Sequence, residues 1–213
     1  EVMKMKNVLI LVIMCFAMVS HAEQPKETLH ALQLGWEKAN YQTDSGQKES
    51  AFSKLVEQSN IAHKRYPDSA EILIWDGIIK STYAGVKGGL GALSLAKEAR
   101  KSLERAISLN GEALHGSAYT SLGVLYSKVP GWPIGFGSDK KAADLLQKGL
   151  AENPEGIDSN YFYAEYLSEK GKKQMAREYY LRAQNAPMRP GRELADIGRQ
   201  NEIRQALEKM QVN

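Results

Sequence analysis

Residue types that often carry out catalysis occur in this chain only in weak patterns. Ser138 and Lys141 form a Ser-x-x-Lys pattern, which some serine acyl-enzymes use for the nucleophile and its base. They begin an amphipathic segment, where a serine more often accepts a hydrogen bond from a backbone N–H group and caps the helix. The sequence Gly-Lys-Lys at 171–173 lacks the upstream glycine and the Ser/Thr of a phosphate-binding loop. We therefore predict no catalytic residue and expect a protein that is not an enzyme.

Metal and cofactor sites are not predicted either. After residue 22 the histidines are His30, His63 and His115, which are far apart and form no His-x₃-His pair for zinc. Asp158 opens a segment, Asp-Ser-Asn, that resembles part of a calcium loop, but the glycine and the distal glutamate are missing. This segment is better explained as a helix cap. The glycines at 135 and 137 lack the third glycine of a dinucleotide-binding turn, so no cofactor is expected.

The loop at 129–137, Val-Pro-Gly-Trp-Pro-Ile-Gly-Phe-Gly, is the most unusual stretch of the chain. Prolines and glycines predict a turn-rich segment, and large aromatic rings favour burial. Trp132 and Phe136 are therefore candidates for binding a ligand or partner. In the alternative interpretation, both rings pack onto the protein's own edge and seal a helical hairpin.

The amino-terminal segment has the layout of a secretory signal. Lys4 and Lys6 precede an apolar run at 8–19, and Ser-His-Ala follows at 20–22. Twelve helical residues span about 18 Å, which is shorter than the roughly 30 Å hydrocarbon core of a bilayer. We expect residues 1–22 to be a signal peptide cleaved near Ala22, which places the mature protein in the periplasm or outside the cell. A retained anchor and a lipidated Cys15 are the alternatives.

Composition indicates an ordinary soluble chain. Its 213 residues include 28 Lys+Arg and 25 Asp+Glu, for a net charge of +3. The single cysteine excludes a disulfide scaffold. Residues 170–213 are basic, with ten Lys/Arg and five Asp/Glu. This end could attract an acidic partner or an anionic lipid surface, although a solvated helix face explains the charges as well. Basic residues are not concentrated at the positions expected to bind a partner, so no nucleic-acid partner is expected.

Helical periodicity and regularly spaced turns indicate a repeat array. Turn-forming residues at 66–68, 109–111, 152–154 and 185–187 separate amphipathic segments with apolar residues three and four positions apart. The last two units carry a pattern of large, small and turn residues: Tyr119, Leu122, Gly123, Tyr126, Ala142, Leu146, Gly149 and Pro154, then Tyr163, Ala164, Leu167, Gly171, Ala176, Tyr180 and Ala183. The two preceding units match in part.

This pattern resembles the tetratricopeptide repeat (TPR) family. The resemblance implies an all-α superhelix of about four helical hairpins over residues 23–187, followed by a capping helix within 188–213. In that last helix we expect Leu194, Ile197, Ile203, Leu207 and Met210 to face inward, and Arg192, Arg199, Arg204 and Lys209 to face outward. The family also implies an adaptor or scaffold that binds another protein or peptide in a concave groove. The groove-facing positions would be Glu71, Ile74, Ile78, Thr120, Val124, Tyr161 and Glu165.

A narrower resemblance is to the periplasmic T component of TRAP transporters. It rests on the secretory start, the number of repeats and the glycine-rich insertion at 129–137. A second glycine-rich insertion, at 84–91, lengthens the hairpin before it. It implies a transport accessory that binds or relays a small organic ligand beside a solute-binding protein. This alternative requires a closed, apolar-lined hole near Trp132 and Phe136, whereas an adaptor requires an open groove. Contact with a membrane surface is the less favoured interpretation.

Overall fold

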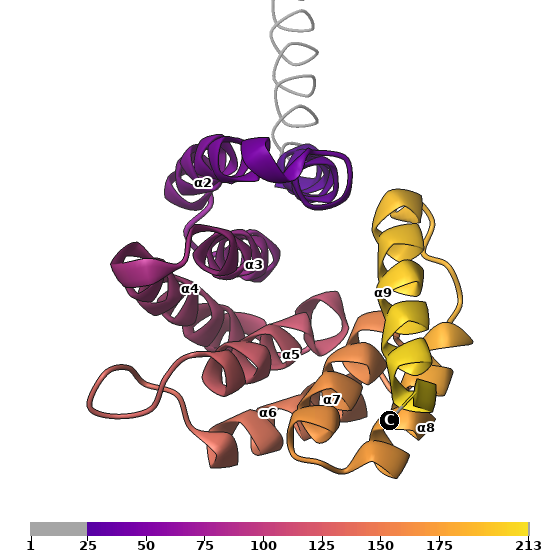
Figure 1. Cartoon of the computed structure of the whole chain (residues 1–213). Coiled ribbons are helices and arrows are strands. Elements are labelled where there is room, and N and C mark those ends of the chain that lie inside the picture. The colour runs from indigo at the N-terminus through magenta and orange to yellow at the C-terminus, as the bar shows by residue number, and fades with distance from the viewer. Residues whose placement is uncertain (1–24, 213) are drawn as a thin grey trace, which may run out of the picture.

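The computed structural model describes residues 25–212, in which every regular element is a helix and no strand occurs (Figure 1). The predicted signal segment, with Lys4, Lys6, Cys15 and Ala22, lies outside the described residues. Within 25–212, no helix combines the length and the apolar character needed to cross a bilayer. The elements are a first helix at 25–41, a short 3-10 turn η1 (Ser45–Gln47), α2 (Lys48–Arg65), α3 (Ala70–Lys87), α4 (Gly89–Asn110), α5 (Ala113–Lys128), α6 (Asp139–Glu152), α7 (Ile157–Glu169), α8 (Lys173–Gln184) and α9 (Glu193–Val212).

Small residues let the paired helices of each hairpin pack closely. A Cβ atom placed on Gly77 of α3 would lie 2.5 Å from Cγ of Leu103 in α4, and one on Gly123 of α5 would lie 2.8 Å from Cγ of Leu146 in α6. Neither position can hold a larger side chain without moving its neighbour. The predicted fold class, an all-α superhelix of helical hairpins, is confirmed.

Serine caps fix two helix starts. The Ser69 hydroxyl accepts a hydrogen bond from the backbone N–H of Ile72 at the start of α3. The Ser138 hydroxyl accepts one from the backbone N–H of Lys141 at the start of α6. Ser138 is therefore the helix cap expected from the sequence, which satisfies one of the free N–H groups of the first turn.

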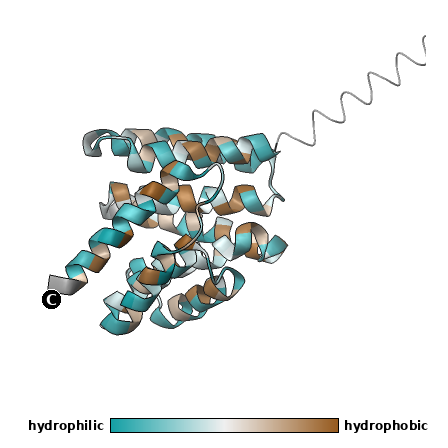
Figure 2. Ribbon diagram, turned by 90° about the vertical axis from the view of Figure 1, so that its right-hand side faces the viewer, coloured by the Kyte–Doolittle hydropathy of each residue, from teal (hydrophilic) through white to brown (hydrophobic). Residues whose placement is uncertain are grey.

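Helix α9 does more than cover the last hairpin. It packs against α7 and α8, and its first half also reaches the helix at 25–41. Ala195 is 3% exposed in an apolar cluster with Leu32 and Trp36, and a Cβ atom on Gly198 would lie 2.4 Å from the Tyr41 ring. Figure 1 shows α9 between the last and first hairpins, and Figure 2 shows it running obliquely in front of the stack. The superhelix is thus closed into a ring.

The face of α9 that packs inward differs in part from the expected one. Ile203 is fully buried as expected, but Ile197 is 55% exposed and Arg199 only 7% exposed. Arg192 also turns inward, with 13% of its side chain exposed. The reason is that α9 packs on acidic partners, Asp158 and Glu37, which bind arginine better than an aliphatic side chain.

Candidate functional site

The ring surrounds a partly open cavity of about 640 Å³. Its walls come from the helix at 25–41, α3, α4, α5, α7 and α9, together with the loop after α5. The first helices of all four hairpins therefore face one space, as expected for the concave side of a repeat array. Small-molecule sites in proteins have volumes of about 300–1,000 Å³, so the cavity is large enough for a compact organic molecule.

Most of the cavity wall is apolar. All four hairpins contribute aliphatic and aromatic side chains: Trp36, Trp75, Ile78, Ala92, Leu93, Ala96, Val124, Leu125, Phe162 and Tyr166. Gly85, Gly89 and Ile134 line the cavity and are themselves exposed, so they mark its mouth. Ile134 is 71% exposed and comes from the glycine-rich loop. The two glycine-rich insertions that the sequence singled out therefore meet at this mouth.

The opposite wall is polar and centres on Arg199 of α9. Its guanidinium group lies 4.3 Å from the centre of the Tyr161 ring and 4.6 Å from that of Phe162. Its Nε donates to Oδ1 of Asp158 at 2.8 Å, and a second nitrogen donates to the Glu202 carboxylate. Two aromatic faces and two carboxylates hold the guanidinium in one orientation.

The charges of this wall balance one another. Burial alone would raise the pKa of Asp158, but Arg199 and Arg189 favour its charged form and lower the pKa to about 2. Burial would lower the pKa of Arg199, but Asp158 and other neighbours raise it above its ordinary value. Burial raises the pKa of the Tyr41 and Tyr161 hydroxyls, which stay neutral at physiological pH. The wall therefore combines paired charges with neutral hydroxyl groups that can form hydrogen bonds.

A second set of ion pairs joins the segment just before α9 to the helix at 25–41 and to α7. The Arg192 side chain donates to the Glu37 carboxylate, whose side chain is 2% exposed. The same guanidinium lies 4.8 Å from the centre of the Trp75 ring. Just before α9, Arg189 donates to Asp196 and to Asp158. We call these contacts, with Ala195 and Gly198, the seam of the ring.

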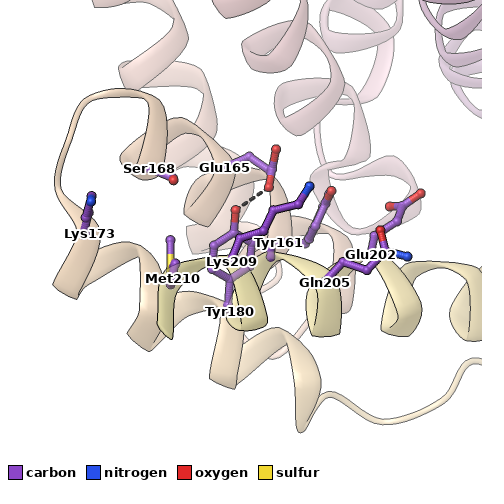
Figure 3. A pocket seen from close by; sticks show the side chains of 10 residues that line it. Tyr161, Glu165, Ser168, Lys173, Tyr180, Glu202, Gln205, Lys209 and Met210 are labelled. Atoms are coloured by element: carbon purple, nitrogen blue, oxygen red, sulfur yellow. Dashed lines mark hydrogen bonds between the residues drawn. The ribbon is translucent and has the colours of Figure 1, made fainter. Parts of the chain in front are cut away.

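A smaller cavity of about 390 Å³ lies between α7, α8 and the second half of α9 (Figure 3). It shares Tyr161, Glu165 and Glu202 with the central cavity, so the two spaces adjoin. The Tyr180 hydroxyl donates to the Glu165 carboxylate on its wall. Its lining is more polar than that of the central cavity, and includes Lys173, Gln205 and Lys209.

Four of the seven predicted groove positions line the central cavity, namely Ile78, Val124, Tyr161 and Glu165. The other three lie elsewhere. Ile74 is fully buried in the cluster between α3, α4 and α5, and Thr120 is 5% exposed and packs against Gly149 of α6. Glu71, in the first turn of α3, accepts a hydrogen bond from Ser69. Ile74 and Thr120 are therefore covered by neighbouring helices, whereas Glu71 is partly buried at the start of α3.

The two aromatic residues of the loop have different surroundings, and neither lines the cavity. Trp132 is 88% exposed. Phe136 packs edge-on against Tyr126 with ring centres 5.5 Å apart, and the Arg100 guanidinium lies 4.5 Å from its ring centre. Phe136 therefore packs on the protein's own edge, as in the alternative interpretation of the loop. Trp132 does not pack there.

Sequence reasoning missed the polar wall. Arg199 and Asp158 are 41 positions apart, and Arg192 and Glu37 are 155 apart, so no local pattern connects them. Trp36 and Ile134 were also missed as lining residues. Among residues 25–212, no group of three or more His, Cys, Asp or Glu side chains is placed to hold a metal ion.

Comparison with known proteins finds no match in protein-family models and none among curated sequences. Among solved structures, the crystal structure of MamA is similar, with 18% sequence identity and a TM-score of 0.45. The match covers 77% of this chain and 89% of that chain. The described residues of the chain itself form stacked helical hairpins, the architecture of an α-helical repeat array.

Proposed function

We propose that the protein binds a small organic molecule in the central cavity and acts as a non-catalytic carrier or transport accessory. The observation that carries this proposal is the closure of the ring by α9, which turns the concave side of a repeat array into a walled space of about 640 Å³. An open groove for a long protein segment requires a free concave side, and the seam occupies that side.

The two walls define the class of ligand. Aliphatic and aromatic side chains cover most of the cavity, which favours a molecule whose bulk is apolar. Arg199 and Glu202 pair with each other on the opposite wall, and the Glu165 carboxylate accepts a hydrogen bond from the Tyr180 hydroxyl. A neutral hydrogen-bonding group fits this wall better than a strongly charged one, because burying an unpaired charge is costly.

A peptide is the second candidate ligand. Asn40, Ser81, Ser121 and Ser127 lie among the apolar lining residues and can bond to the backbone groups of a short extended segment. This is the function that TPR-like adaptors perform, restricted here to a segment that enters through the mouth. A long segment lying along the array is not compatible with the seam.

The proposed location is the periplasm or the exterior of the cell. It rests on the sequence of residues 1–22 alone, and a solute-binding protein is then the expected partner of a transport accessory. Fractionation of cells that express the chain with a carboxy-terminal tag tests the location. Tagged protein recovered in the cytoplasm at full length contradicts it.

Titration with the neutral apolar fluorophore N-phenyl-1-naphthylamine tests the cavity. We expect saturable binding of one probe per chain. Gly85→Trp should weaken this binding at least about tenfold, because Gly85 lines the mouth and a side chain added there meets no atom within 4 Å. Gly46→Trp is the matched control, since Gly46 also has open space around it and lies outside the cavity.

Equal binding by both variants would contradict the proposal, as would the absence of saturable binding to the unchanged protein. Competition then separates the two candidate ligands. Displacement of the probe by small uncharged organic molecules, and not by short blocked peptides, supports the carrier. Displacement by short blocked peptides, and not by small uncharged organic molecules, supports the peptide-binding alternative.

A further inference from the structure

The turns of the array fall on two separate edges. Successive helices run antiparallel, so the turns inside the hairpins gather on one edge and those between hairpins on the other. On the first edge, which we call the hairpin edge, Lys128 at the end of α5 pairs with Glu169 at the end of α7. Lys170 pairs with Asp139 at 2.6 Å, so the third and fourth hairpins meet there.

The hairpin edge carries an exposed apolar tip. Trp132 is 88% exposed and Ile134 is 71% exposed, and both belong to the loop between α5 and α6. The loop is held in place below this tip. The N–H of Gly135 donates to the Gly131 carbonyl at 3.0 Å, and the N–H of Gly137 donates to the Pro130 carbonyl at 2.9 Å. Phe136 anchors the base of the loop against Tyr126. Two large apolar side chains are thus presented to solvent on a fixed support, which is costly unless a partner covers them.

The two edges differ in charge. Beyond the two ion pairs, the hairpin edge carries five exposed lysines, Lys87, Lys140, Lys141, Lys172 and Lys173, against the exposed carboxylates of Asp44 and Glu49. The opposite edge exposes Glu112, Glu152 and Glu155, together with Asp68, which pairs with Arg105, and two basic residues, Lys64 and Arg65. The apolar tip therefore lies on the basic edge. The hairpin edge thus combines an apolar tip with exposed lysines. Its complement is a flat, negatively charged surface with an apolar layer beneath its polar groups.

We propose that the hairpin edge docks on an anionic lipid bilayer, with Trp132 and Ile134 inserted among the headgroups and the lysines facing lipid phosphates. Tryptophan favours the interface between water and hydrocarbon, because its ring is apolar and its N–H needs a partner. Lysines near an anionic surface add attraction that salt screens within about 8 Å at physiological ionic strength. Ile134 also lines the mouth of the central cavity, so docking faces the mouth toward lipid. The docking does not depend on whether the cavity holds a ligand.

The tryptophans supply a site-specific test. Trp36 is 8% exposed and Trp75 is 5% exposed, whereas Trp132 is almost fully exposed. Vesicles of phosphatidylcholine and phosphatidylglycerol should therefore shift the emission of the full chain to shorter wavelength through Trp132. Vesicles of phosphatidylcholine alone should produce a much smaller shift. Binding through the apolar segment at 8–19 would leave Trp132 in water, so sedimentation with vesicles without an emission shift overturns the proposal.

Matched variants place the contact. Ile134→Ser should weaken binding to anionic vesicles about tenfold, because an inserted isoleucine loses its apolar burial. Ile61→Ser removes an equally exposed isoleucine, 67% exposed on α2, and should bind like the unchanged protein. Both variants should keep the melting temperature. Equal binding by the two contradicts the proposal. An emission shift that appears without lipid and grows with protein concentration also contradicts it, since a second copy of the chain then covers Trp132.

Discussion

The stack of hairpins and the seam that closes it are held together by different physical interactions. Within the hairpins, glycines and alanines contact large aliphatic side chains, as at Gly77 with Leu103 and Gly123 with Leu146. Across the seam, arginines meet carboxylates and aromatic rings, as at Arg192 with Glu37 and Trp75. The stack therefore depends on shape, and the seam depends on paired charges that have been removed from water. Each can be broken separately.

Loss of Arg192 should have the largest effect on the seam. Arg192→Met leaves the Glu37 carboxylate buried without its partner, and breaking a buried pair in this way costs about 3–5 kcal/mol. We expect the free energy of unfolding, measured by urea titration, to fall by about that amount. Binding of the cavity probe should weaken as well, because Arg192 lines the cavity.

The double variant Arg192→Met with Glu37→Gln is the control for this substitution. Removing the orphaned charge should recover a large part of the lost stability, because the penalty comes from the unpaired carboxylate. If the double variant is no more stable than the single one, the seam is held by the packing around Ala195 and Gly198, and its charges are secondary.

Substitution of Gly123 should have the next largest effect, within the stack. Gly123→Leu places a side chain where even a Cβ atom lies 3.0 Å from the backbone nitrogen of Leu146. Overpacking of this kind costs about 1–3 kcal/mol, and α5 and α6 would have to move apart. Gly85→Leu on α3 is the matched control, because a Cβ atom there meets nothing within 4 Å. Equal urea midpoints for the two variants would disprove the predicted repeat register.

The fold was predictable from the sequence because its packing is local. Gly123 and Leu146 belong to one hairpin, and their types recur at regular positions in the next unit as Ala164 and Tyr180. The site was predictable only in part. Ile78, Val124, Tyr161 and Glu165 follow from the repeat register, but Ile74 and Thr120 show that the register alone does not say which positions neighbouring helices cover. The ring closure was not predictable. An arginine in an amphipathic helix is normally assigned to the side that faces solvent, and its distant acidic partner is known only from the structure.

Acid should weaken the seam through Asp158. The pKa of Asp158 is about 2 in the folded protein and roughly 3.9 in an unfolded chain. Its contribution to stability is therefore complete above about pH 4 and is lost as the pH falls toward 2. Asp158→Asn should be less stable than the unchanged protein at pH 5, and this difference should shrink at pH 2. A difference in unfolding free energy that stays constant over this range would show that Asp158 contributes through packing.

The smallest effect on stability is expected at Trp132, which belongs to neither the stack nor the seam. Trp132→Ala should change the free energy of unfolding by no more than about 0.5 kcal/mol, because the side chain is 88% exposed. Phe136→Ala, four residues away in the same loop, should cost about 2 kcal/mol, because its ring packs between Tyr126 and Arg100. Urea titration of the two variants side by side separates the tip of the loop from its anchor. A large loss at Trp132 would mean that the tryptophan packs against the protein in solution, and the exposed tip would then no longer support docking at the hairpin edge.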